Sequence, residues 1–404
     1  MRWIQFIHGF YLTVILILVI ILLIYKHMTT PPSLKGAYLN YSSTNARKNG
    51  TLNPSDLAYP QILDSRQDFF SLANKLCGQI NAPFKTRVII NSGATESIAQ
   101  CIWWAKQNNQ FGIIQGTNFD HSAVKDNCEN FGLTYDNVAL RKNKILDNCA
   151  MIFLTHVDSK TGEILDIANF KRNVLDKYNY LYSDKLANPY NKHVRQYKPL
   201  VVLDATQSMN KIPIDMERWG INAVFFSLHK LGGPIGTGLL FIDDSTHTFK
   251  PLIAGKQQGE LRGGTFPLES VLNSAYIFDH YDDANERKER WQQVYDKLTK
   301  AGLVVYKPKG KHLYNTLLID IHHCPLGIIN ALAEKNIYVG NVSACANETA
   351  DKEQKAKKKL KGGDTDEHEI QPFEKAIRIS FKKSKELTDD VIDQIVKVIK
   401  EPSE

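Results

Sequence analysis

The most constraining feature of this sequence is a series of short apolar runs, each of which ends in a polar residue or a turn signal. Polar, helix-like segments separate these runs, and this alternation is typical of an α/β domain. Fully apolar runs are typical of strands that are buried on both faces of a parallel sheet. We therefore predict a large α/β domain with a mostly parallel sheet. Its expected strands are residues 87–91, 111–114, 150–154, 200–203, 223–227 and 239–242.

The character of the chain changes after about residue 270. The pattern there predicts a smaller α+β domain, so the expected division is a large domain over residues 31–270 and a small C-terminal domain over residues 271–404. The final helix expected in the small domain is amphipathic, with its apolar residues on one face. The elements expected there are a polar helix over 282–301, strands near 303–305 and 316–321, and a helix over 388–399.

Residues 3–25 form an uncharged segment with an almost wholly aliphatic centre. A helix of this length crosses a bilayer of about 30 Å at about 1.5 Å per residue. A cleaved signal peptide is the alternative, but the apolar run is long for one and no small-x-small cleavage site follows it. We therefore expect a transmembrane anchor at residues 3–25. More basic residues follow this segment than precede it, which favours a cytosolic body on a single-pass membrane protein.

The composition limits the partners and the metal chemistry. The net charge is +7, from 50 basic and 43 acidic residues, which does not indicate a chain-wide surface for nucleic acid. A Lys-rich run at 352–361 is interpreted as a solvated loop, or alternatively as a contact with an anionic membrane or an acidic partner. The six cysteines form no CxxC pair, so neither a zinc site nor a disulfide framework is expected. A reduced compartment fits this cysteine usage.

Reactive side chains follow two of the predicted strands. Asp204 ends one strand, and Ser227, His229 and Lys230 end the next. Ligands of open parallel sheets bind beyond the carboxyl ends of the strands. A lysine in a desolvated site forms a Schiff base, and Thr95 at a helix N-terminus suits a phosphate. Together these residues predict a site for pyridoxal phosphate, with an aspartate paired to its ring nitrogen.

Two long stretches resemble one family closely. LDATQSMNKIPID (203–215) and FFSLHKLGGPIGTG (225–238) resemble the class V aminotransferase superfamily and, within it, the cysteine desulfurases. The resemblance extends over about residues 36–400 and implies the fold-type I pyridoxal-phosphate transferase fold, with a large mostly parallel sheet and a small C-terminal domain. It also implies a homodimer. The shorter motifs that agree in order are NSGATES (91–97), DHSAV (120–124), THVDSKTGEI (155–164), LRGGT (261–265), VSACAN (342–347) and IRISF (377–381).

The resemblance implies roles for the residues around the cofactor ring. Lys230 matches the lysine that binds the cofactor as a Schiff base and moves protons at the substrate. Asp204 matches the acid that keeps the ring nitrogen protonated, and Gln207 matches the residue that bonds the phenolic oxygen. His121 matches the imidazole that stacks on the ring. Ser159 stands where the desulfurases have an asparagine, and this departure also resembles the transaminase branch.

The resemblance also implies roles at the phosphate and at the substrate. Arg378 matches the arginine that grips the substrate carboxylate, and Cys345 matches the nucleophile that takes sulfur as a persulfide. Thr265 matches a threonine that reaches the phosphate bound by the partner subunit. The phosphate ligands implied within the same subunit are Thr95, Ser227, His229 and the backbone near Ala94.

The favoured function is conversion of L-cysteine to L-alanine, with the sulfur passed through Cys345 to an acceptor that the sequence does not name. One alternative is a class V aminotransferase or another lyase, in which Cys345 has no catalytic role. The other alternative is a membrane-tethered scaffold without activity. Simpler interpretations of single residues are a surface lysine at 230, a helix N-cap at Asp204 and a small buried hydrophobe at Cys345.

Overall fold

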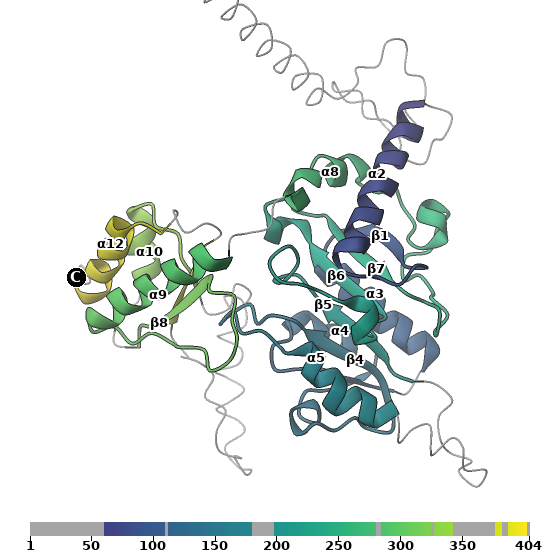
Figure 1. Cartoon of the computed structure of the whole chain (residues 1–404), viewed down its shortest axis with the longest axis horizontal. Coiled ribbons are helices and arrows are strands. Elements are labelled where there is room, and N and C mark those ends of the chain that lie inside the picture. The colour runs from purple at the N-terminus through teal and green to yellow at the C-terminus, as the bar shows by residue number, and fades with distance from the viewer. Residues whose placement is uncertain are drawn as a thin grey trace, which may run out of the picture.

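The computed structural model describes residues 60–109, 112–179, 198–279, 284–322, 324, 327–341, 376–381 and 387–401. Within these ranges seven strands form the larger sheet, in the order β1-β7-β6-β5-β4-β2-β3 (Figure 1). Pairs from β3 through β2, β4 and β5 to β6 are parallel, whereas β7 runs antiparallel to both β6 and β1. The prediction of a mostly parallel sheet is thus confirmed. The strands are β1 (Arg87–Asn91), β2 (Ile113–Gln115), β3 (Thr134–Asp136), β4 (Cys149–Thr155), β5 (Leu200–Asp204), β6 (Ala223–Ser227) and β7 (Gly238–Ile242).

Alternate residues of the central strands enter two separate cores. All residues of β4, β5, β6 and β7 are buried. Phe225 of β6 packs with α3 (Ala94–Asn108) and α4 (Ser122–Asn130), whereas the next residue, Phe226, packs with α2 (Pro60–Gln79) and α8 (Leu268–Leu272). This is the two-residue period of a strand that is covered on both faces.

The smaller sheet has three antiparallel strands in the order β8-β10-β9. Its core includes Trp291, Ile319 and Ile377. The strand expected near residues 303–305 is reduced to an isolated bridge between Val305 and Ile319, and β10 was not predicted. The elements are α9 (Ala284–Lys300), β8 (Thr316–Asp320), α10 (Ile328–Glu334), β9 (Gly340–Asn341), β10 (Ala376–Ser380) and α12 (Asp389–Lys400).

The last helix, α12, forms as its sequence predicts. The Thr388 hydroxyl accepts a hydrogen bond from the amide of Val391, and acidic residues follow in the first turn, where the positive end of the helix dipole favours them. Its buried residues Ile392, Ile395 and Ile399 face the small sheet's core. The helix therefore closes the small unit on the side away from the large sheet (Figure 1).

Several predicted features lie outside the described residues. These are the anchor at residues 3–25, the Lys-rich run at 352–361, and Cys345. Among the helices of the described ranges, none combines the length and apolarity needed to cross a membrane. The predicted domain boundary at residue 270 stays a prediction, although the two sheets do form separate cores.

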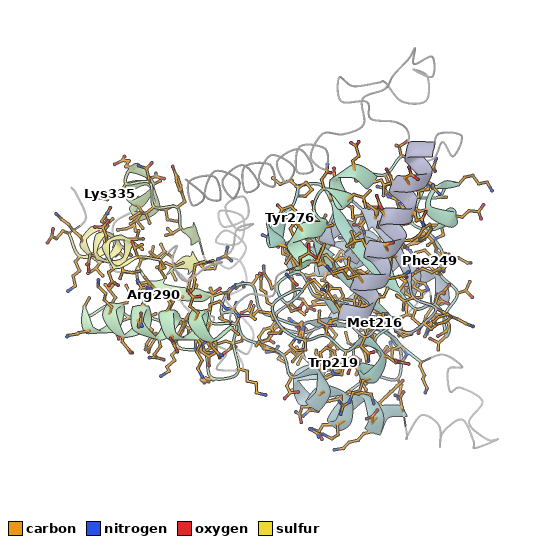
Figure 2. The ribbon with its side chains drawn as sticks, turned by 45° about the horizontal axis from the view of Figure 1, so that its top comes forward. Met216, Trp219, Phe249, Tyr276, Arg290 and Lys335 are labelled. Atoms are coloured by element: carbon orange, nitrogen blue, oxygen red, sulfur yellow. The ribbon has the colours of Figure 1, made fainter. Side chains whose placement is uncertain are left out.

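A buried histidine follows β4 directly. The side chain of His156 is 3% exposed, and its ring packs edge-on against Trp219 with 5.5 Å between ring centroids. Trp219 lies in the lower part of the large unit in Figure 2. The His156 amide donates to the carbonyl of Asp204, so this histidine also ties the end of β4 to β5. Burial lowers the pKa of His156 to about 4.

The buried imidazole predicts a pH dependence of stability. Between pH 4 and the unfolded-state pKa of about 6.5, the unfolded chain binds a proton at residue 156 and the native protein does not, so the free energy of unfolding rises with pH. We expect urea unfolding to give a wild-type advantage over His156→Gln that grows by about 3 kcal/mol from pH 4 to pH 6.5 and is then constant. If the difference in the free energy of unfolding between wild type and His156→Gln does not change between pH 4 and pH 6.5, His156 is not a buried neutral imidazole.

Candidate active site

The carboxyl ends of β4, β5 and β6 meet at one edge of the large sheet because these strands are parallel. Thr155, Asp204 and Ser227 are the last residues of the three strands. The first residue of antiparallel β7, Gly238, pairs with Ser227 on one side and with Asn91 of β1 on the other. The ends of most of the central strands therefore lie at this edge of the sheet.

The N-terminus of α3 closes against Ser227. The amide of Ala94 donates to the Ser227 hydroxyl at 2.7 Å. Gly93 has φ of 138°, a conformation that side chains disfavour, and a Cβ on Gly238 would lie 2.6 Å from the Gly93 Cα. Within the described residues, no side chain caps this helix. Backbone amides at a helix N-terminus, next to a hydroxyl, fit a phosphate group.

Asp204 is buried at the end of β5. Its Oδ1 accepts from the amide of Thr206 at 2.8 Å. Burial raises the pKa of Asp204, and the nearby charge of His121 lowers it in part. The buried hydroxyls of Thr206 and Ser208 have no hydrogen-bond partner among the described residues. A buried acid beside hydroxyls without partners fits a cationic aromatic nitrogen, which would stabilise the ionised carboxylate. The residues present therefore fit a pyridoxal phosphate ring as well as its phosphate.

His121 lies at the N-terminus of α4, where its Nδ1 accepts from the amide of Ala123 at 3.1 Å. The residue before it, Asp120, is half-buried, and the sequence analysis did not identify it as a functional residue. Asp120 accepts hydrogen bonds from the hydroxyls of Thr117 and Thr155, each at 2.6 Å, and from Tyr135 at 2.9 Å. Burial raises the pKa of Asp120 to about 7 against these hydrogen bonds. The only signal in the sequence was its position beside His121.

The Asp120 cluster connects His121 to the centre of the edge. Thr155, one of its donors, pairs in register with Asp204 on the neighbouring strand. The Asp120 carboxyl also accepts from the amide of Thr117 at 2.9 Å. The loop that carries His121 is therefore fixed to β4, one strand away from Asp204. A cofactor ring stacked on His121 would therefore lie against a loop that these hydrogen bonds hold in place.

Lys230 and His229 lie on a short 3-10 helix, Leu228–Leu231, directly after β6. Both side chains are exposed at the edge. The glycine-rich turn that follows is closed by hydrogen bonds from the amide of Leu228 to the carbonyl of Thr237 and from the amide of Gly233 to the carbonyl of Leu228. Burial and the charge of Lys230 lower the pKa of His229. The backbone of Lys230 thus lies three residues after Ser227, directly beyond the carboxyl end of β6.

Arg378 brings the small sheet to the same edge. It lies in β10, and its Nη1 donates to the carbonyl of Ser159 at 3.0 Å. Burial lowers the pKa of Arg378, and the charge of Asp158 raises it in part. Its Nε is buried without a partner among the described residues, and a Cβ on Gly340 would lie 3.1 Å from its Nη2. A guanidinium with an unsatisfied N–H suits a carboxylate ligand.

The remaining predicted residues are placed as follows. Thr95 is exposed in the first turn of α3, and Gln207 is half-buried after β5, with its carbonyl accepting from Lys211 Nζ at 3.0 Å. Thr265 is exposed, three residues after an arginine that pairs with α3. Cys345 lies outside the described residues. In the ranges described, no group of three or more His, Cys, Asp or Glu residues is arranged to hold a metal ion.

One family model matches most of the chain, and curated relatives match part of it. The family model described as aminotransferase class-V matches residues 66–389. A cysteine desulfurase IscS of Plasmodium falciparum is 30% identical over 251 residues, which is 56% of this chain and 42% of the relative. The chain spans about half the length of the curated relatives that it matches first.

Two solved structures share the fold. A NifS-like protein superposes with a TM-score of 0.67 and 21% identity, covering 86% of this chain and 90% of the other. A structure described as SspA in complex with cysteine gives a TM-score of 0.60 and 19% identity, covering 87% and 96%. The matched family model spans most of the chain and includes every strand of the large sheet. The chain therefore belongs to the class-V aminotransferase family, whose enzymes use pyridoxal phosphate.

Proposed function

We propose that this protein is a pyridoxal-phosphate-dependent cysteine desulfurase, which converts L-cysteine to L-alanine and passes the sulfur to an acceptor through Cys345. The observation that carries the proposal is the joint position of Asp204, Lys230 and the Ala94–Ser227 contact at one sheet edge. Curated relatives that match part of the chain, from Plasmodium falciparum and Pasteurella multocida, are cysteine desulfurases, and one structural neighbour is described as a complex with cysteine.

Different residues at this edge of the sheet would bind different parts of the cofactor. Asp204 would hold the ring nitrogen, Lys230 the aldehyde carbon, and Gln207 the phenolic oxygen, while His121 stacks on the ring. The bound cofactor supplies an electron sink for the carbanion at the substrate Cα. Burial disfavours an isolated Asp204 carboxylate, and a protonated ring nitrogen beside it would offset that cost, so the pair would stabilise the protonated ring. The phosphate would be held by the Ala94 backbone, Thr95, Ser227 and His229, and Thr265 would reach the phosphate of a partner subunit.

Besides Cys345, which lies outside the described residues, two residues would act on the substrate directly. Arg378 binds its carboxylate, using the guanidinium that Ser159 and Asp158 hold near the sheet edge. Lys230 Nζ takes the proton from the substrate Cα and returns one during release of alanine. Because Arg378 belongs to the small sheet and Lys230 directly follows β6 of the large one, the substrate would lie between the two units.

The other cysteines are poor candidates for the sulfur acceptor of the first step. A thiol must ionise to attack sulfur. Cys101 and Cys149 are buried, and burial raises the pKa of Cys77 and Cys324. Burial likewise raises the pKa of Cys128, to about 12. This exclusion supports Cys345, in VSACAN (342–347), as the nucleophile.

A homodimer and a membrane anchor complete the proposal. Phe70, Ile235 and Tyr276 are large, exposed apolar side chains, and Tyr276 is labelled at the surface in Figure 2. They belong to segments that contact one another, since Lys75 of α2 bonds to Asp279 and a Cβ on Gly233 would lie 3.1 Å from Ile277. This face suits a second copy of the chain. Residues 3–25 would tether the dimer to a membrane, with its body in the cytosol.

Ser159 favours one alternative, because its side chain is shorter than the asparagine of the desulfurases. In that case the protein is a class V aminotransferase, or a lyase acting on another small amino acid, and Cys345 has no catalytic role. The two functions differ in whether activity depends on that thiol.

The first test is product formation from L-cysteine by the full chain, purified in detergent with pyridoxal phosphate. We expect alanine and sulfide under reducing conditions, with a loss of about 100-fold or more in Cys345→Ala and in Lys230→Ala. Cys324→Ala is the matched control and should keep full activity. Wild-type rates in Cys345→Ala would favour the aminotransferase or lyase alternative.

Arg378→Lys tests the carboxylate contact. A lysine keeps the charge but loses the two-pronged geometry, so we expect KM for L-cysteine to rise about tenfold or more with a smaller change in kcat. Steady-state kinetics measure both, and the affinity for pyridoxal phosphate should not change. An unchanged KM would remove Arg378 from the substrate site.

A further inference from the structure

The loop at residues 257–264 lies outside the proposed site but is held tightly against it. Gln258, Gly259 and Glu260 have φ of 49°, 64° and 66°, so three consecutive residues occupy the left-handed region. Two of them are not glycine, and such residues persist there only where surrounding contacts over-determine the backbone. The contacts that hold the loop in this conformation therefore indicate its role.

The first contact is with the edge of the large sheet. The Gln258 side chain accepts from the amide of Ile90 at 2.7 Å and donates to the carbonyl of Ile90 at 2.9 Å. Strand β1 is the last strand of the sheet on this side. The side-chain amide of Gln258 thus pairs with both backbone groups of Ile90 at the edge of the sheet, as a neighbouring strand would.

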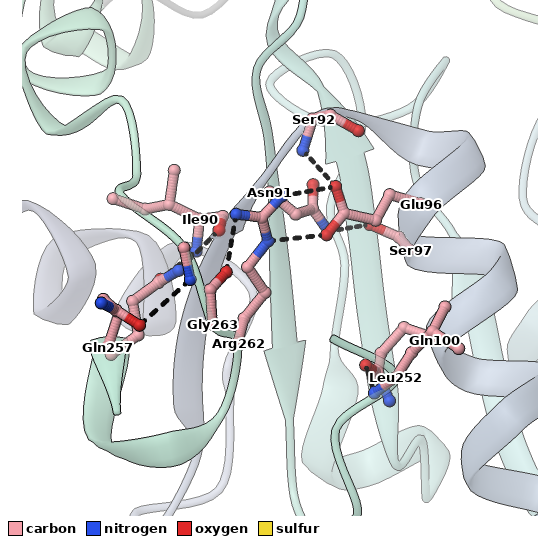
Figure 3. Close-up of polar contacts among 12 residues, drawn as sticks. Ile90, Asn91, Ser92, Glu96, Ser97, Gln100, Leu252, Gln257, Arg262 and Gly263 are labelled. Carbon is pink, nitrogen blue, oxygen red and sulfur yellow. Dashed lines mark hydrogen bonds and ion pairs between the residues drawn. The ribbon is translucent and has the colours of Figure 1, made fainter. Parts of the chain in front are cut away.

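The second contact is a two-pronged ion pair with the start of α3. Arg262 Nε donates to Glu96 Oε1 at 2.8 Å and Nη2 donates to Oε2 at 3.2 Å (Figure 3). The two side chains are only 18% and 13% exposed. Burial acts to raise the pKa of Glu96, but the hydrogen bonds from Arg262 and Ser92 and the charge of Arg262 hold this pKa below its usual value. The pair is thus ionised and partly shielded from water.

Glu96 also holds the backbone that precedes the helix. Its Oε2 accepts from the amide of Ser92 at 2.9 Å (Figure 3), and Asn91 Oδ1 accepts from the amide of Gly93 at 3.0 Å. Residues 92–96 therefore have two supports. Ser227 holds Ala94 from the sheet, and Arg262 holds Glu96 from the 257–264 loop. The segment between these supports is the proposed phosphate cradle.

The charges give Arg262 a second effect on this cradle. The Glu96 carboxylate lies in the first turn of α3, where a phosphate dianion would also bind. Without a cation beside it, this carboxylate repels the phosphate and competes for the same helix end. Arg262 neutralises Glu96 and fixes its geometry.

We propose that Arg262 is a positioning residue for the cofactor phosphate: acting through Glu96, it holds the cradle at residues 92–96 and cancels the negative charge beside it. Arg262 does not touch the cofactor. The inference rests on the proposed position of the phosphate at the α3 N-terminus. Its consequence is selective, because loss of the pair weakens recognition of the phosphate and leaves recognition of the ring intact.

The test compares binding of pyridoxal phosphate with binding of pyridoxal, which lacks the phosphate. Both are titrated into the full-length apoprotein and followed by absorbance of the bound ligand. In Arg262→Gln we expect Kd for pyridoxal phosphate to rise about tenfold or more, with less than about a threefold change for pyridoxal. The double variant Glu96→Gln/Arg262→Gln removes the unpaired carboxylate and should recover part of the lost affinity.

Arg87→Gln is the matched control, since Arg87 pairs with Asp244 away from the cradle. It should leave both affinities unchanged. Equal losses for the two ligands in Arg262→Gln, or no loss for pyridoxal phosphate, would overturn the proposal, and so would a double variant weaker than the single one. Failure of the wild-type apoprotein to bind pyridoxal phosphate would instead contradict the proposed function.

Discussion

The close approach of α3 to the end of β6 is the constraint on which the rest of the site depends. Ser227 accepts from Ala94, and this is possible because Gly238 has no side chain to separate β7 from Gly93. The antiparallel strand β7 makes the approach, since it lies between β1, which leads into α3, and β6, which leads into Lys230. Two segments more than 130 residues apart in the chain thus meet within one hydrogen bond.

Around the Ala94–Ser227 contact, hydrogen bonds and ion pairs from neighbouring residues hold the other parts of the site in place. The Asp120 cluster holds the loop of His121, and the Glu96–Arg262 pair holds the first turn of α3. Arg378 enters from the small sheet and is fixed by the carbonyl of Ser159. A site of this kind is pre-organised, so ligand binding does not have to order the side chains first.

Local pattern was sufficient to predict most of the large sheet. The expected strands at 87–91 and 223–227 coincide with β1 and β6, because apolar runs between turn signals have few other conformations. The antiparallel direction of β7 was not predicted, since direction depends on pairing between distant strands. Strand β3 was missed because it has only three residues and ends in Asp136, a residue type that strands disfavour, and β10 was identified only as the IRISF motif.

The same limit applies to the site. Asp204, Ser227 and Lys230 were found because they follow strands, and the edge of a parallel sheet collects strand ends. Asp120 contacts Thr155, 35 residues away, and Arg262 contacts Glu96, 166 residues away, and no local pattern encodes contacts of this kind. The roles of all the site residues toward a cofactor or substrate stay predictions, and those of Thr265 and Cys345 rest on the family resemblance alone.

The most direct test of the account is to locate the lysine that binds the cofactor. The full-length protein is incubated with pyridoxal phosphate, reduced with borohydride and digested, and the modified peptide is identified by mass spectrometry. The account predicts a single phosphopyridoxyl group on Lys230, in the SLHKLGG segment at 227–233. Modification mainly at another lysine, with Lys230 unmodified, would contradict the assignment of the active site to this sheet edge.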